Sequence, residues 1–297
     1  MGLFCRLAKQ PFFEEKDMKK WKKAILLALC ALLFLLSVGV VVYPLLSNRQ
    51  MERRQNAVLA EYDAMVAEDE AVPALLEAAR TYNALLVSGQ YTEEDLTQAT
   101  ALFGSELIGR VDIPAISISL PIYTSDTALE KGAVHMRGTS LPVGGESVHA
   151  AVSAHSGMSS ARMFTDLERL QIGDRFTVQC LGETLYYEVD QIATVTPDDV
   201  SELAILPGEE HCTLITCTPY GVNSHRLLVR GRRIELDETE KDLPVISEAE
   251  KTYSSFWMQQ YIRGILCGLG IVAVIAAALI TFIFIRKRRH TKCRETQ

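Results

Sequence analysis

Cys217 is the residue whose type and position most favour covalent chemistry. It ends an apolar run that begins at Thr213, and Pro219 and Gly221 follow it closely. A strand that stops at a proline and turns at a glycine presents its last side chains at the rim of a sheet, where functional sites are assembled. A thiol there is suited to nucleophilic attack, although a free cysteine more often packs as a small buried hydrophobe.

Positive charge or a base near Cys217 would decide whether its thiol is reactive, because the thiolate is the nucleophile. The next predicted strand begins with His225 and Arg226. Since successive strand residues point to opposite faces, only one of these two side chains can face Cys217, and the pattern does not choose between them. His155 ends another predicted strand, just before Ser156, and is a further candidate at a rim.

The remaining histidines are weaker candidates because of where they lie. They occupy a glycine-flanked connection, the middle of a strand, the start of the Cys217 strand and the C-terminal tail: His135, His149, His211 and His290. Cys212, Cys217 and His225 together would suggest a zinc site. However, zinc ligands normally come in closer pairs with a fourth ligand, and strand residues five apart face opposite ways. We therefore predict no metal ion and no other cofactor.

The elements that must position these residues are short strands. Runs rich in β-branched and aromatic residues alternate with turns that contain glycine or proline. Because no repeating helix separates them, they predict an antiparallel barrel or sandwich. The runs cover residues 108–114, 116–123, 147–155, 174–182, 183–195, 211–219 and 225–236. Within this region only residues 161–170 have a helical pattern.

A helical segment is predicted ahead of the strands. Residues 47–107 are rich in Ala, Leu and Glu, with Pro73 expected to divide the helix into two pieces. Thr92 and Asp95 have the spacing of a capping box and predict a further helix start. After the strands, residues 236–263 form a polar, acidic linker.

Two long apolar segments, residues 24–46 and 264–285, are long enough to cross a membrane as helices. Basic residues flank both on their outer sides, and such residues stay in the cytoplasm. We therefore predict a cytoplasmic tail (1–23), a transmembrane helix (24–46), an extracellular helical stalk (47–107), a catalytic β-barrel (108–235), a linker (236–263), a transmembrane helix (264–285) and a basic cytoplasmic tail (286–297). A cleaved signal peptide is the alternative for the first segment, but its apolar core is long and it lacks a small-x-small cleavage site.

Charge and cysteine content narrow the function of the predicted extracellular part. Residues 47–263 contain 17 Lys and Arg against 33 Asp and Glu, a net charge of −16. Such a surface argues against nucleic-acid binding, which needs a basic face. Of the seven cysteines in the chain, only Cys180, Cys212 and Cys217 lie in this part. An odd, sparse set is a poor disulfide framework, so at least one thiol is expected to be free.

The sequence TLITCTPYGVNSHRLLVRG, residues 213–231, resembles the signature of sortases, which is Thr-Leu-x-Thr-Cys followed by a nearby Arg. It is most similar to the class C, pilin-polymerising sortases. The similarity continues upstream, in order and with appropriate gaps, and covers roughly residues 108–234. The upstream stretches are 113–123, 129–157, 161–174 and 189–203.

This resemblance implies a mainly β fold: an eight-stranded sortase-type β-barrel with an N-terminal helical segment and two transmembrane helices. It implies Cys217, His155 and Arg226 as the catalytic residues, with Arg226 facing the thiol and His225 facing away. Two features depart from the family pattern. Relatives often have Arg where this chain has Ser156, and many carry a lid with an Asp-Pro-aromatic triplet, which is absent between residues 47 and 113.

The implied reaction is a transpeptidation. The Cys217 thiolate attacks a Leu-Pro-x-Thr-Gly-like sorting signal to give a thioester, His155 moves the proton, and Arg226 supplies fixed positive charge. The implied partners are surface proteins that carry the signal, with a pilin lysine as the acceptor. The alternatives are a housekeeping sortase that uses a cell-wall peptide amine, a hydrolytic cysteine peptidase, and a non-catalytic barrel that binds a partner.

Overall fold

The computed structural model describes residues 15–92, 94–95, 106–158, 160–236, 261–268, 270–272, 274 and 281. The chain divides into two compact units, Met1–Ser47 and Asn48–Gln297. The second unit contains all the strands and every candidate catalytic residue. It is therefore the unit that holds the candidate site.

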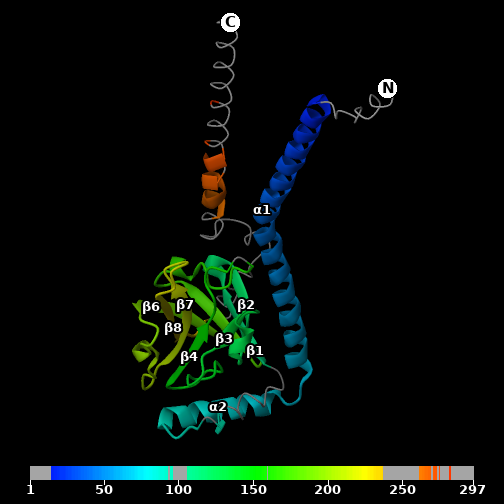
Figure 1. The fold of residues 1–297 in the computed structure, drawn as a ribbon. Coiled ribbons are helices and arrows are strands. Elements are labelled where there is room, and N and C mark those ends of the chain that lie inside the picture. Colours follow the sequence, from blue (N-terminus) through cyan, green and yellow to red (C-terminus); the bar gives the residue numbers. More distant parts are fainter. Residues whose placement is uncertain are drawn as a thin grey trace, which may run out of the picture. The chain divides into compact units, whose positions relative to one another are not determined.

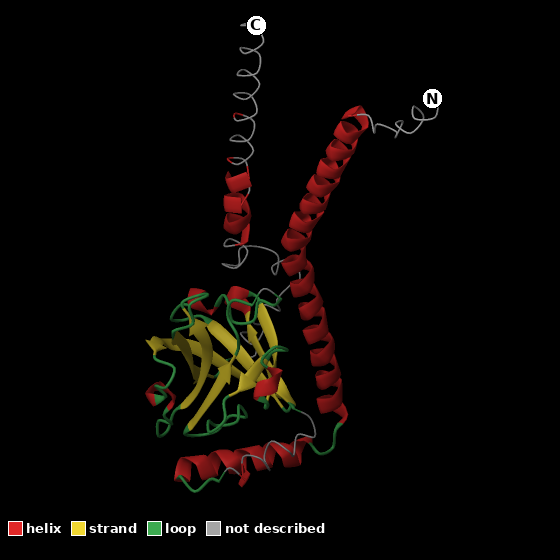
Figure 2. Ribbon diagram, viewed as in Figure 1, coloured by secondary structure: helices red, strands yellow, loops and turns green. Residues whose placement is uncertain are grey.

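The second unit is built around a closed barrel of eight strands, in the order β1-β2-β3-β4-β7-β8-β6-β5 (Figures 1 and 2). This confirms the mainly β fold and the eight-stranded barrel. The strands are β1 (Leu107–Ile113), β2 (Ile118–Tyr123), β3 (Ala133–His135), β4 (Val148–Ser153), β5 (Arg175–Cys180), β6 (Glu183–Val195), β7 (Glu210–Thr218) and β8 (His225–Ile234).

Two features of the barrel differ from the pattern-based prediction. The pattern contains seven runs and misses β3, which is only three residues long and entirely buried, so it shows no alternation. The expected sheet was antiparallel, but β2 pairs with β3 and β4 pairs with β7 in parallel. Two strands must be antiparallel only when a tight hairpin turn joins them, and neither of these pairs is joined in that way.

Alternate residues of each strand point into the barrel and form its main core. In β7 these are Cys212 and Leu214, which are fully buried in the main apolar cluster. Ile215 belongs instead to a second, smaller cluster. Because strand side chains alternate between faces, this second cluster lies on the outer face of the barrel.

The segment 161–170 is not the helix that its sequence predicts. It consists of turns and one short 3-10 helix, Leu167–Arg169. Its polar groups bond to another part of the chain: the Phe164 N–H donates to the His155 carbonyl (2.9 Å), and the Thr165 hydroxyl accepts from the Gly157 N–H (3.1 Å). These contacts compete with the hydrogen bonds that an α-helix would make.

Two helices precede the barrel, α1 (Glu15–Glu68) and α2 (Val72–Ser88). The division falls just before Pro73, which sits in the first turn of α2, where a proline costs no hydrogen bond. Thr92 and Asp95 do form a capping box: the Asp95 carboxylate accepts from the Thr92 N–H (2.6 Å), and the Thr92 hydroxyl accepts from the Asp95 N–H (3.2 Å). The residues that follow, 96–105, lie outside the described residues.

Both helices are fastened to the barrel by buried polar side chains. The Tyr62 hydroxyl donates to the Ile108 carbonyl (2.6 Å) and accepts from the Leu181 N–H (2.9 Å). Asn83 of α2 donates to the carbonyl of Leu141 (2.9 Å) and accepts from its N–H (2.8 Å). The part of α1 beyond Asn48 and all of α2 are therefore integral to the catalytic unit.

Replacing Tyr62 with phenylalanine should destabilise this unit by about 1–3 kcal/mol, because it leaves buried backbone groups of Ile108 and Leu181 without a partner. Denaturant unfolding of the purified protein, followed by circular dichroism, measures the change. Tyr186→Phe is the matched control, since the Tyr186 hydroxyl has no hydrogen bond within the described residues. Equal unfolding free energies for the two variants would contradict the prediction.

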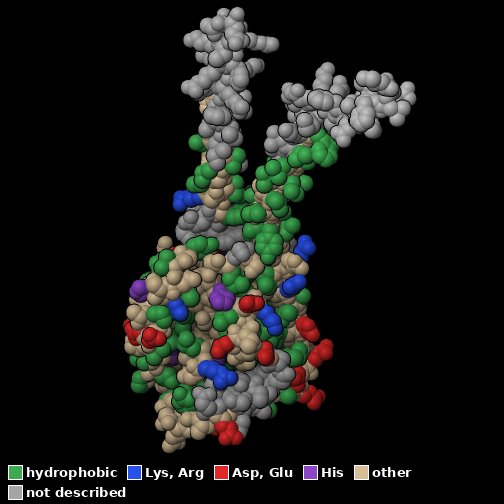
Figure 3. Space-filling model, viewed as in Figure 1, with side chains coloured by type: hydrophobic (Ala, Val, Ile, Leu, Met, Phe, Trp, Pro, Cys, Tyr) green, Lys and Arg blue, Asp and Glu red, His purple; other side chains and the backbone are tan. Residues whose placement is uncertain are grey.

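Among the described residues, one helical segment is long and apolar enough to cross a membrane, Leu27–Glu68, and a signal sequence would have the same character. Apolar side chains cover its N-terminal part (Figure 3). The predicted linker and second span fall largely outside the described residues. A short apolar helix, Tyr261–Val272, overlaps the end of the predicted linker and the start of the second span.

Candidate active site

The register of β7 and β8 decides which residue of the second strand shares a face with Cys217. In this antiparallel pair Cys217 lies directly opposite Arg226, and Thr218 lies opposite His225. Opposed residues project from the same face of a sheet. Arg226 is therefore on the face of Cys217, and His225 is on the other, where it is exposed.

His155 is brought to the same place by the other neighbour of β7. Strand β4 runs parallel to β7, with Ser153 beside Ile215. Hydrogen bonds continue this pairing past the end of β4: the Ala154 N–H donates to the Ile215 carbonyl (3.1 Å), and the Thr216 hydroxyl donates to the Ala154 carbonyl (2.8 Å). His155 consequently lies beside the end of β7, next to Cys217.

The three candidate residues thus meet at one end of three adjacent strands, β4, β7 and β8. All three are half-buried, so they are both held by the fold and accessible. On the same outer face, two residues before Cys217, the second apolar cluster begins with Ile215. Its other buried members are Ala151 and Leu228, and Met136, Ala193, Val195 and Leu203 pack against them. The Cys217 thiol therefore lies at one end of the apolar surface that these residues form, which we call the apolar floor.

Comparison with known proteins now places the chain in a family. A family model described as the Sortase domain matches residues 111–234. Sortase A of Streptococcus agalactiae serotype III (strain NEM316) is 31% identical over 143 residues, which cover 46% of this chain and 58% of that protein. The solved sortase C of Streptococcus pneumoniae is 41% identical, with a TM-score of 0.56, over 61% of this chain and 97% of that one. The solved Clostridium perfringens sortase C with the C-terminal cell wall sorting motif is 39% identical, with a TM-score of 0.56, over 61% of this chain and 99% of that one. The chain belongs to the sortase family.

The other cysteines of this sortase's barrel differ from Cys217 in their surroundings. Cys180 and Cys212 are free thiols that are fully buried, and burial raises the pKa of each well above its ordinary value. Both are therefore held as neutral thiols. Cys217 is the partly exposed cysteine among the three.

The zinc alternative is not supported by the geometry. Cys212 projects into the barrel core, whereas Cys217 lies on the outer face, so the two thiols cannot bind the same metal ion. Within the described part of the chain, no group of three or more His, Cys, Asp or Glu side chains is arranged to hold a metal ion.

Three histidines of the sortase barrel, His135, His149 and His211, are buried. His149 bridges the Ala204 carbonyl (Nδ1, 2.9 Å) and the Thr213 hydroxyl (Nε2, 2.7 Å), which ties the β6–β7 connection to β7. Burial lowers the pKa of His149 and of His211, and lowers that of His135 to about 4. These imidazoles stay neutral near pH 7, and none lies at the Cys217 end of the strands.

Arg226 is itself positioned by the turn that joins β7 to β8. Its Nη1 donates to the backbone carbonyls of Asn223 (3.3 Å) and His225 (3.1 Å). Within the described residues its hydrogen bonds run through Nη1 alone, which leaves Nε and Nη2 to bind another group. A guanidinium held in this way offers fixed positive charge and further donors beside the thiol.

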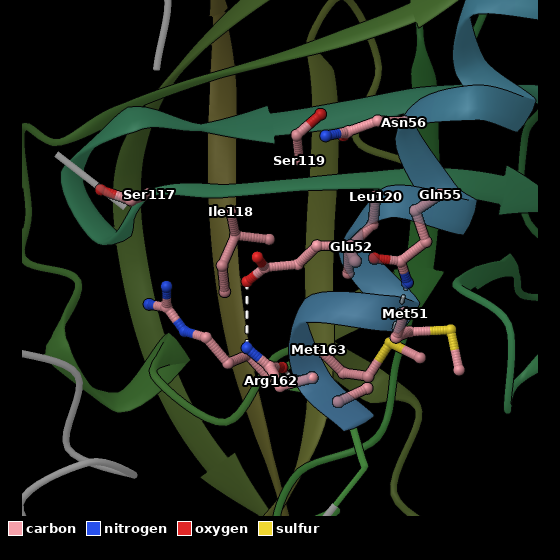
Figure 4. Close-up of a pocket in the computed structure, with 12 residues that line it drawn as sticks. Met51, Glu52, Gln55, Asn56, Ser117, Ile118, Ser119, Leu120, Arg162 and Met163 are labelled. Carbon is pink, nitrogen blue, oxygen red and sulfur yellow. Dashed lines mark hydrogen bonds between the residues drawn. The ribbon is translucent and has the colours of Figure 1, made fainter. Parts of the chain in front are cut away.

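A small polar cavity lies between α1 and the start of β2 (Figure 4). Its volume of about 30 Å³ has room for one or two water molecules. The Arg162 N–H donates to the Asn48 carboxamide there (2.9 Å), and Gln55 donates to the Lys131 carbonyl (2.9 Å). These bonds fasten α1 to the barrel, and the cavity is too small for a peptide.

Sequence reasoning missed one residue of the site, Ser156. Its hydroxyl donates to the carbonyl of Cys217 (2.6 Å). In the sequence, Ser156 stands out only as the residue that follows His155 and departs from the family pattern. The contact depends on the pairing of β4 with β7, which are far apart in the chain, so no local pattern could reveal it.

Proposed function

We propose that this sortase is a cysteine transpeptidase that cleaves a Leu-Pro-x-Thr-Gly-like sorting signal and transfers it to an amine. The observation that carries the proposal is the placement of Cys217, His155 and Arg226 at one end of three adjacent strands. The apolar floor that starts at Ile215 supports it, because an extended peptide with apolar residues ahead of the scissile bond could lie along it.

The reaction proceeds in two acyl transfers. The Cys217 thiolate attacks the peptide carbonyl between Thr and Gly, and the tetrahedral intermediate collapses to a thioester as the amine leaves with a proton from His155. The acceptor amine then attacks the thioester carbonyl and gives a proton to His155, and the thiolate departs. Arg226 stabilises the negative charge that develops on the carbonyl oxygen.

The acceptor is proposed to be a lysine of a pilin subunit. The solved relatives support this choice: the Clostridium perfringens sortase C was solved with the C-terminal cell wall sorting motif, and the structure of the Streptococcus pneumoniae sortase C bears on pilin substrate specificity. We further propose that the N-terminal helix anchors the enzyme in the cell membrane, with the barrel outside. Enzyme and membrane-tethered substrate would then meet at a raised effective concentration.

Product analysis tests the proposed reaction. The purified protein is incubated with a sorting-signal peptide, with and without a lysine-bearing pilin subunit, and the products are separated by gel and mass. A ladder of covalent multimers supports pilin transfer. Single conjugates to a cell-wall peptide amine would indicate a housekeeping sortase, hydrolysed peptide alone would indicate a peptidase, and intact peptide in every reaction would reject catalysis.

Replacing Arg226 with lysine should lower kcat/KM by about 100-fold despite the retained charge, because an ammonium lacks the planar set of donors that both the turn carbonyls and the oxyanion use. Steady-state transpeptidation with a fluorogenic signal peptide measures the loss. Arg230→Lys is the control, since Arg230 pairs with Asp190 at 2.8 Å, farther along β8. Wild-type turnover in Arg226→Lys would remove Arg226 from the mechanism.

A further inference from the structure

We infer that Ser156 is a positioning residue that sets the placement of His155 relative to Cys217. This inference rests on the proposed function, because it concerns the same pair of groups. It starts from the 2.6 Å hydrogen bond in which the Ser156 hydroxyl donates to the Cys217 carbonyl.

This bond replaces the backbone hydrogen bond that a longer β4 would donate to the Cys217 carbonyl. In a parallel ladder, carbonyls two residues apart on one strand point to the same neighbour. The Ile215 carbonyl accepts from the Ala154 N–H (3.1 Å), so the Cys217 carbonyl also points toward the β4 side. There the chain of β4 has already turned away at Ser156 and Gly157, and the serine hydroxyl, rather than a backbone N–H, reaches the carbonyl.

His155 is therefore held from both sides. The residue before it, Ala154, is bound to β7 through two hydrogen bonds, and the carbonyl of His155 accepts from the Phe164 N–H (2.9 Å). The residue after it, Ser156, makes the direct link to the residue that carries the nucleophile. Of these restraints, only the Ser156 bond joins the His155 turn to Cys217 itself.

The turn after Ser156 is shaped to permit this contact. Gly157 has a φ of +76°, a conformation that other residues rarely adopt. A Cβ added there would lie 3.4 Å from the ring of Tyr220, so the β7–β8 turn packs closely against this glycine.

Three variants test the inference: Ser156→Ala, Ser156→Thr and the control Ser88→Ala. Ser88 also donates its hydroxyl to a backbone carbonyl, that of Leu85 (2.8 Å), but at the end of α2. We expect Ser156→Ala to lower kcat by about 10- to 100-fold with KM nearly unchanged, because misplaced groups slow chemistry more than binding. Threonine keeps the hydroxyl and should restore kcat to within about threefold of wild type. Ser88→Ala should behave as wild type.

A second measurement separates this inference from the proposed reaction. Iodoacetamide alkylates Cys217 without any sorting signal, and its rate is followed by mass spectrometry across the pH range in which thiol and imidazole titrate. In Ser156→Ala the pH profile should move toward that of His155→Ala. If wild type forms no acyl-enzyme and the profile still moves, the proposed function fails and the inference stands.

The opposite results overturn the inference. A wild-type kcat and a wild-type alkylation profile in Ser156→Ala would show that the hydroxyl does not position His155. A fall in kcat that follows the fraction of unfolded protein, with no recovery in Ser156→Thr, would show that Ser156 supports only the fold.

Discussion

Replacing Cys217 with alanine should abolish the covalent acyl-enzyme while the barrel stays folded. The variant loses the nucleophile, and neither of the other two barrel thiols substitutes for it because Cys180 and Cys212 are buried and neutral. The fold should tolerate the change because Cys217 is half-buried on the outer face of β7 and fills no core position. Intact-mass spectrometry after incubation with a sorting-signal peptide measures the adduct, and circular dichroism measures the fold.

Cys180→Ala is the matched control for this experiment, since it also removes one thiol from the barrel. It should keep the adduct in full, although loss of a buried side chain lowers its stability. Peptide mapping of the wild-type adduct gives an independent reading. An adduct mapped to Cys180 or Cys212, or one that persists in Cys217→Ala, would show that Cys217 is not the nucleophile.

Removing the imidazole of His155 should lower kcat/KM by about 10²- to 10⁴-fold, which is the usual contribution of a general acid–base residue. His225→Ala should stay within about threefold of wild type, because His225 is exposed on the opposite face of β8 and its imidazole bonds only to the Ser224 hydroxyl (2.9 Å) within the described residues. Steady-state transpeptidation at a fixed pH compares the two variants. The reverse order of activities would exchange the roles of the two histidines.

Most of the barrel is predictable from the sequence because its strands alternate or form continuous apolar runs. The exceptions have physical causes. β3 pairs through only two residues on each side and is buried throughout, so it leaves no periodic signal. The segment 161–170 has helical spacing, but its backbone and side chains bond to the His155 turn instead.

The candidate site is only half predictable by the same reasoning. Cys217 and His155 stand out because each follows an apolar strand and precedes a turn. The choice between His225 and Arg226 depends on the register of β7 and β8, and a slip of one residue would reverse it. The length of the connecting turn does not fix that register, so the resemblance to sortases had to supply it. The hydrogen bond between Ser156 and Cys217 depends on the pairing of β4 with β7, which are far apart in the chain, so no local sequence pattern predicts it.

The parallel pairing of β4 with β7 also determines when, during folding, the candidate site is assembled. His155 and Cys217 belong to strands that are separated in the chain by all of β5 and β6, so they become neighbours only when the closed sheet has formed. Pairings between distant segments form late in folding. We therefore expect an incompletely folded chain to carry a Cys217 thiol that a sorting signal does not acylate. Acylation competence would then report completed folding, and no premature thioester could form on an unfinished molecule.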